Sequence, residues 1–134
     1  MGKELFPNFI KEHYEIHEWK HATAILKNDF VDEWDDIIQV LKNFRFRKSW
    51  ITVGVGEKSE ISKSIDKSFV ELGWKEKMFS TKVTVDENSL DSPTHKVDCY
   101  KNRIALEIEW NNKDPFFDRD LNNFRLLFDL RAIS

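Results

Sequence analysis

The chain has 134 residues, with 21 Lys and Arg against 24 Asp and Glu, a net charge of −3 and an apolar share of 40%. This length predicts one domain, and the 11 Phe and 5 Trp supply enough apolar surface for a core, which excludes a wholly disordered chain. The net charge excludes a protein that coats nucleic acid through overall basicity, although a local basic face stays open.

The sequence predicts neither a membrane span nor a secretory signal peptide. No stretch approaches the roughly 18 apolar residues of a membrane span, and the N-terminal residues lack the pattern of a secretory signal. The single cysteine, Cys99, excludes a disulfide framework and indicates a reducing compartment. We therefore expect a cytoplasmic protein, with residues 1–13 as a loosely attached N-terminal arm and residues 14–134 as a single domain.

The first half of the chain predicts one clear helix. Residues 14–26 fit both a strand and a helical turn and stay ambiguous. Residues 29–44 place apolar side chains at helical spacing, namely Phe30, Val31, Trp34, Ile37, Ile38 and Leu41. Asn28 or Asp29 would cap this helix at its N-terminus. Residues 50–55 then have the composition of a strand.

The second half predicts two more helices. One runs over about 59–72 and stops at Gly73, and a strand at 82–85 and a loop at 86–93 follow it. A third helix starts near Asp114, where a proline follows. Its apolar stripe is Phe117, Leu121, Phe124, Leu127 and Phe128. Since a strand would normally continue an α/β sheet after such a helix, we expect a core that is truncated at its C-terminus.

The stretch from 95 to 111 has the pattern of a β-hairpin and carries the candidate chemistry. From Ile104 the residues alternate strictly between apolar and mostly acidic, as in a strand with two different faces. A turn at residues 101–104 would place Asp98 directly opposite Glu107, on one face of the hairpin. Glu109 lies two residues further along that face, so three carboxylates would gather there. Cys99 alternates with Asp98 and should be a buried structural thiol.

Such a patch needs a compensating partner, because like charges that oppose each other destabilise a hairpin. Mg²⁺ is a suitable partner, since one or two carboxylates bind it while water and substrate phosphate complete its shell. It would polarise a phosphoryl oxygen and lower the pKa of a bound water, from which Glu109 could take a proton. The alternative is a solvated strand face, and a one-residue change of register would remove the Asp98–Glu107 pair.

The pattern of Asp98, then Glu107-Ile108-Glu109 at the end of a hairpin, then a helix, resembles the PD-(D/E)xK nuclease motif. The third position of that motif is usually Lys and the first is usually Pro. Here they are Glu109 and Val97, and both departures occur in the branch that contains the restriction endonucleases BamHI and BglII. The order of the predicted parts also fits, so residues 14–134 are similar to BglII-type restriction endonucleases.

This resemblance implies a Mg²⁺-dependent endonuclease that hydrolyses double-stranded DNA and leaves 5′-phosphate ends. It implies Asp98 and Glu107 as side-chain metal ligands, the backbone carbonyl of Ile108 as a further ligand, and Glu109 near the attacking water. It also implies an α/β restriction-endonuclease-like core, with a mixed sheet flanked by helices, that works as a homodimer on a palindromic site. The alternative is a catalytically silent or truncated DNA-binding or association module on the same fold.

Three further residues are candidates for contact with DNA. Asn111 and Asn112 resemble a segment that approaches bases, and Asn can pair bidentately with adenine, although loop Asn residues often serve turn chemistry. Lys58 follows Gly54 and Gly56 at a predicted helix start, where it could contact a phosphate. A plain strand-to-helix turn also explains these glycines.

A competing signal is H-E-x-x-H at His17-Glu18-Trp19-Lys20-His21. On a helix this spacing puts two His on one face for Zn²⁺, with Glu18 as a general base, as in zinc peptidases. The motif is short, and Glu33 is the one conceivable third ligand, within an ordinary acidic helix turn. We interpret these histidines as surface or core residues.

Overall fold

The computed structural model describes residues 2–48, 60–91, 95–109 and 114–134. The predicted strand at 50–55 and three candidate site residues, Lys58, Asn111 and Asn112, lie outside these ranges. The chain divides into two compact units, 1–55 and 56–134, and each is described by itself. Within the described ranges, no helix is long and apolar enough to cross a membrane.

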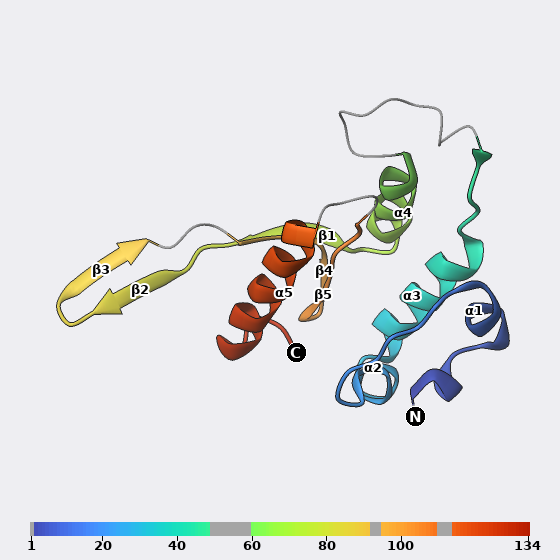
Figure 1. The fold of residues 1–134 in the computed structure, drawn as a ribbon, viewed down its shortest axis with the longest axis horizontal. Coiled ribbons are helices and arrows are strands. Elements are labelled where there is room, and N and C mark those ends of the chain that lie inside the picture. The colour runs from blue at the N-terminus through green and yellow to red at the C-terminus, as the bar shows by residue number, and fades with distance from the viewer. Residues whose placement is uncertain (1, 49–59, 92–94, 110–113) are drawn as a thin grey trace. The chain divides into compact units, whose positions relative to one another are not determined.

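The first unit is helical. Its elements are the 3-10 helix η1 (Gly2–Leu5) and the α-helices α1 (Asn8–His13), α2 (Ala22–Asp29) and α3 (Val31–Asn43) (Figure 1). The core of this unit is formed by Ile10 of α1 with Trp34 and Ile38 of α3. The hydroxyl group of Tyr14 donates a hydrogen bond of 2.6 Å to the backbone carbonyl of Leu41 and so fixes the segment after α1 to α3. The division into an arm and one domain stays a prediction.

The predicted helix over 29–44 is α3, but the predicted cap is wrong. Asn28 and Asp29 belong to the last turn of α2, and Phe30 alone separates the two helices, with φ −131° and ψ 58°. The side-chain amide of Asn28 donates to the carbonyl of Ala24 at 2.8 Å. Asn28 therefore bonds back into α2 and is not positioned to cap α3.

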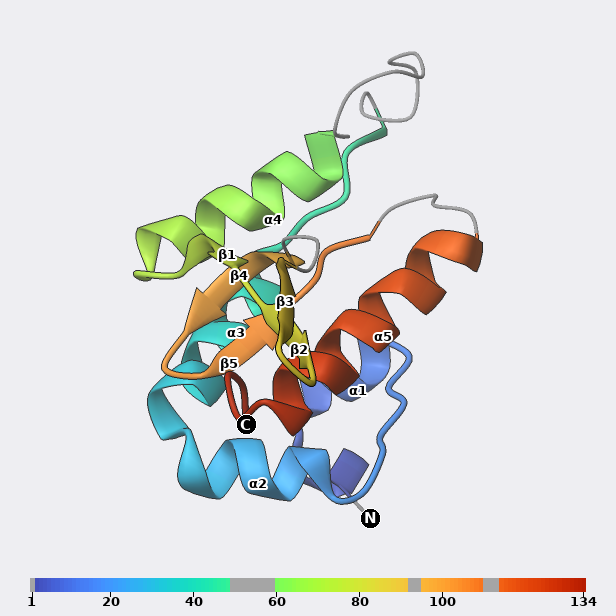
Figure 2. The ribbon, with the colours of Figure 1, turned by 90° about the vertical axis from the view of Figure 1, so that its left-hand side faces the viewer.

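The second unit is a three-stranded antiparallel sheet with a helix on each side (Figure 2). The strands, in the order β1-β4-β5, are β1 (Lys75–Phe79), β4 (His95–Lys101) and β5 (Ile104–Leu106), and the helices are α4 (Glu60–Glu71) and α5 (Asp114–Asp129). Val97 of β4, Leu127 of α5 and Ile133 form a buried cluster between the sheet and α5. The predicted α/β class, with helices flanking the sheet, is confirmed.

The helix predicted over about 59–72 ends as its sequence indicates. Gly73 has a φ of +92°, and the backbone amides of Gly73 and Trp74 donate to the carbonyls of Val70 and Phe69 at 3.0 and 3.1 Å. This pair of bonds satisfies the last carbonyls of α4 and turns the chain into β1. An added Cβ at Gly73 would meet no atom within 4 Å, so the need for glycine is purely conformational.

Substituting Gly73 tests this helix end. We expect Gly73→Ala to lower the free energy of unfolding by about 1 kcal/mol, because the left-handed backbone opposes a Cβ that otherwise has room. Gly73→Asn should lose less, since Asn enters this region more readily. Urea denaturation of the three proteins measures the difference, and equal stability of the alanine variant and the wild type would contradict it.

Two strands escaped the sequence prediction. β1 carries Lys75, Glu76 and Lys77, all exposed, so no apolar alternation marks it as a strand. β3 (Asn88–Asp91) falls in the predicted loop of 86–93, which is wrong there. It pairs with the correctly predicted strand β2 (Lys82–Val85) in a two-stranded hairpin, which projects away from the larger sheet (Figure 1).

Candidate functional site

The candidate site begins at the β4–β5 hairpin. The paired residues are Lys101 with Ile104, Tyr100 with Ala105, and Cys99 with Leu106. Asn102 and Arg103 have φ of 46° and 69°, the left-handed pair of a two-residue hairpin turn. The predicted turn is thereby confirmed, and one more step of this register brings Asp98 opposite Glu107.

Asp98 sits at an irregularity of β4. The two residue steps from Lys75 to Lys77 on β1 face three steps from Tyr100 to Val97 on β4, so β4 carries one extra residue there. Such a bulge redirects the side chains around it, and bulges are frequent beside active sites. The predicted buried thiol is confirmed, since Cys99 is 2% exposed and its Sγ lies 3.7 Å from Oδ1 of Asp66 on α4.

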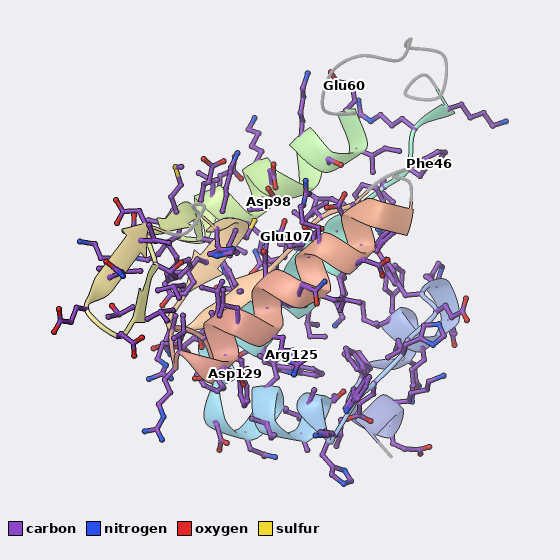
Figure 3. All side chains as sticks on the ribbon, turned by 60° about the vertical axis from the view of Figure 1, so that its left-hand side comes forward. Phe46, Glu60, Asp98, Glu107, Arg125 and Asp129 are labelled. Carbon is purple, nitrogen blue, oxygen red and sulfur yellow. The ribbon has the colours of Figure 1, made fainter. Side chains whose placement is uncertain are left out.

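The strand predicted to run on from Ile104 to Trp110 ends at Leu106. The backbone amide of Ile108 donates to Oδ2 of Asp98 at 3.3 Å. The Ile108 amide therefore bonds to the Asp98 side chain and not to the backbone of β4. The regular β4–β5 hydrogen bonding ends here, and Asp98 holds the segment that follows β5. Figure 3 shows Asp98 and Glu107 close together where the hairpin strands end.

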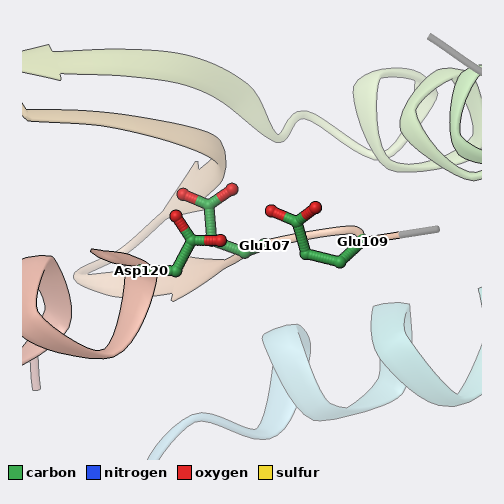
Figure 4. A group of neighbouring side chains, drawn as sticks. All are labelled: Glu107, Glu109 and Asp120. Atoms are coloured by element: carbon green, nitrogen blue, oxygen red, sulfur yellow. The ribbon is translucent and has the colours of Figure 1, made fainter. Parts of the chain in front are cut away.

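Three carboxylates converge beyond the hairpin. Glu107, Glu109 and Asp120 each offer an oxygen, and these oxygens lie within 4.8 Å of one another (Figure 4). Glu107 and Glu109 come from the segment after β5 and are partly buried, whereas Asp120 comes from α5 and is 7% exposed. Glu107 and Glu109 are therefore only partly solvated, and the metal site stays a prediction.

Burial and neighbouring carboxyl groups raise the pKa values of Glu107 and Glu109. Burial, followed by the hydrogen bond and the charge of Asp98, raises the pKa of Glu107 to about 8. Burial, followed by the hydrogen bond and the charge of Asp120, raises the pKa of Glu109 to about 7. Near neutral pH the cluster therefore retains protons that a bound cation would displace, since metal ligands must be deprotonated.

A comparison with known protein families identifies the family of this chain. A family model described as restriction endonuclease BglII/BglIII matches residues 14–134. The chain belongs to the BglII/BglIII restriction endonuclease family. Membership assigns it to the DNA endonucleases and makes DNA its binding partner. No match was found among curated proteins or among solved structures.

Asp120 is the site residue that the sequence analysis of this restriction endonuclease homologue missed. It lies four residues before Phe124 and seven before Leu127, so it occupies the apolar face of α5. An acidic residue on the apolar face of a predicted helix was the sequence signal that could have identified Asp120. Its position beside Glu107 depends on the packing of α5 against the sheet, which helical periodicity does not reveal.

The zinc-peptidase alternative is wrong. Residues 17–21 precede α2 and do not form a helix, and His21 has a φ of +58° at its start. The carboxylate of Glu18 accepts hydrogen bonds from the backbone amides of Gly2 and Thr23 at 2.8 and 3.1 Å. The ring of His17 is exposed and contacts Glu15 at 2.9 Å. Glu18 therefore ties the start of α2 to η1, and the two histidines do not share a helix face.

Proposed function

We propose that this chain is a Mg²⁺-dependent DNA endonuclease that leaves 5′-phosphate and 3′-hydroxyl ends. The observation that carries the proposal is the group of carboxylates at the end of the β4–β5 hairpin, in a chain of the BglII/BglIII restriction endonuclease family. The spacing of Asp98, Glu107 and Glu109 supports it from the sequence, and the β4–β5 register supports it from the fold.

The residues present fit a hard divalent cation. Their donors are carboxylate oxygens, which Mg²⁺ prefers, and oxygens of Glu107 and Glu109 lie within 4.8 Å of each other. Asp98 and Glu107 would hold the ion through their side chains, and Ile108 would add its backbone carbonyl. Burial and the neighbouring carboxyl groups raise the pKa values of Glu107 and Glu109, which supports a site that a cation would stabilise.

The proposed reaction is hydrolysis of a phosphodiester bond. The oxygen of a water molecule forms a bond to phosphorus while the bond from phosphorus to the 3′ oxygen breaks. When bound, the metal ion would supply polarisation of a phosphoryl oxygen and a lowered pKa for a coordinated water. Glu109 would orient the attacking water or accept its proton, for which a pKa near 7 is well suited.

The proposal includes contacts with DNA, which are inferred from the chemistry of three residues. Asn111 and Asn112 come two and three residues after Glu109 and would approach base edges, where Asn reads adenine. Lys58 would contact a phosphate. The proposal also includes a homodimer, as the family resemblance implies for palindromic sites. The competing candidate is a catalytically silent DNA-binding module. A carboxylate cluster that binds no metal would favour this candidate.

Plasmid cleavage tests the proposed activity. We expect supercoiled plasmid to be cut with Mg²⁺ and left intact with EDTA. Glu107→Ala should lower the rate more than about ten-fold, since even partners outside the ligand shell cost about 10–100-fold when removed. Glu87→Ala, the same substitution in the exposed β2–β3 turn, should cleave like the wild type. Ligation of the product without prior phosphorylation would report 5′-phosphate ends.

Two outcomes would count against the proposal. Cleavage that persists in EDTA or in Glu107→Ala would contradict the assigned ligand and metal. Absence of cleavage with every divalent metal tested would favour the silent module.

A further inference from the structure

Asp120 is the most deeply buried acid of the site, and one of its oxygens is unsatisfied. Oδ1 accepts two hydrogen bonds from the guanidinium group of Arg119, at 3.2 and 3.3 Å. Oδ2 is buried and accepts no hydrogen bond from an N–H or hydroxyl group of the described residues, and the hydrogen bond that Asp120 shares with Glu109 requires a proton on one of the two carboxyl groups. Only 9% of the side chain is exposed, so solvent offers little compensation.

An orphaned carboxylate oxygen of this kind requires an explanation. Buried polar atoms are nearly always hydrogen-bonded, and leaving one unpaired is unfavourable, most of all for a charged group. The nearest groups do not reduce this cost, because oxygens of Glu107 and Glu109 lie within 4.8 Å of an Asp120 oxygen and supply no positive charge. Arg119 offsets one negative charge at most.

The geometry also brings Asp120 in from a different element than the other acids. Glu107 and Glu109 follow β5, whereas Asp120 stands on the face of α5 that packs on the sheet (Figure 4). Leu127, two turns along the same face, is fully buried in the cluster under α5 and fixes the helix against β4. The packing of α5 on β4 therefore brings Asp120 to this place.

We propose that Asp120 is a further cation-binding residue, which holds the metal ion from the α5 side together with Glu107, while Glu109 keeps its place beside the attacking water. A cation between these groups would give Oδ2 a partner and would replace the protons that the cluster otherwise retains. This inference rests on the proposed function for the identity of the ion and for its catalytic use. It adds that the ion joins α5 to the end of the hairpin.

Direct titration of the full chain with Mn²⁺ or Mg²⁺, in the absence of DNA, tests the proposal. Asp120→Asn should weaken binding at least about ten-fold, whereas Asp118→Asn, the same change at an exposed position of α5, should stay within about two-fold of the wild type. The cation should also raise the melting temperature of the wild type more than that of Asp120→Asn. A purely structural role would change the melting temperature in EDTA but leave the metal-induced rise intact.

A second measurement needs no variant and guards against a misfolded one. Fe²⁺ with ascorbate cleaves a polypeptide near the bound ion, and in the wild type we expect cuts close to residue 120 as well as at 107–109. Cuts at the hairpin alone, wild-type affinity in Asp120→Asn, or no cation binding by the wild type would each overturn the proposal. If Asp120→Asn binds the cation with unchanged affinity and DNA cleavage still depends on metal, only the role of Asp120 is contradicted. If cation binding depends on Asp120 but no cleavage occurs, only the proposed nuclease activity is contradicted.

Discussion

Leu127→Ala is expected to lower the free energy of unfolding of the second unit by about 3–5 kcal/mol. Leu127 is fully buried, with Val97 and Ile133 against it, and Phe124 and Tyr100 close around them. Truncation would remove buried methyl groups and leave a cavity that the backbone of α5 and β4 cannot close, which is the costly case for such substitutions. Because this cluster holds α5 on the sheet, Asp120 should lose its position with it.

Leu121→Ala is the matched control. It is the same substitution in the same helix, but Leu121 is 66% exposed, so we expect a loss below about 1 kcal/mol. Urea unfolding followed by tryptophan fluorescence includes the second unit through Trp74, which is 1% exposed, and a variant without Trp34 removes the signal of the buried tryptophan in the first unit. Equal destabilisation by the two variants would show that α5 is not fixed to the sheet through Leu127.

The sequence predicts the hairpin well because its signals are local. The alternation after Ile104 and the turn at Asn102 and Arg103 fix the β4–β5 register, and with it the approach of Asp98 to Glu107. The end of α4 at Gly73 is equally local, since it depends on a backbone conformation that favours glycine. Such features require no knowledge of distant parts of the chain.

The missed features depend on contacts between distant segments. β1 has no apolar pattern of its own, and it is a strand because it pairs with β4. The bulge at Asp98 appears only when β4 is aligned with β1. Asp120 joins Glu107 and Glu109 through the packing of Leu127, across a separation that no motif spacing encodes. The local strand and turn patterns therefore located the acids of the hairpin, whereas tertiary packing placed Asp120 beside them.

The metal-free protein is expected to become less stable as the pH rises from about 5 to 8. The folded-state pKa of Glu107 is about 8, against an ordinary value of 4.5, so the folded protein binds more protons than the unfolded chain in this interval. The free energy of unfolding then falls with rising pH. Since Glu107 is only partly buried and water screens it, we expect a loss of about 2 kcal/mol, well below full conversion of the shift.

Glu107→Gln isolates this contribution, because glutamine keeps the shape of the side chain and cannot ionise. In EDTA its stability should vary less with pH than that of the wild type, and at pH 8 it should be the more stable protein. Glu87→Gln, at an exposed position, should follow the wild-type curve. Saturating Mg²⁺ should reverse the order at pH 8, since the ion stabilises the folded state only where it finds ionised ligands. A wild-type curve that rises between pH 5 and 8 in EDTA would mean that the carboxylates near Asp98 are ionised and compensated by the protein itself, which would remove the electrostatic need for a cation.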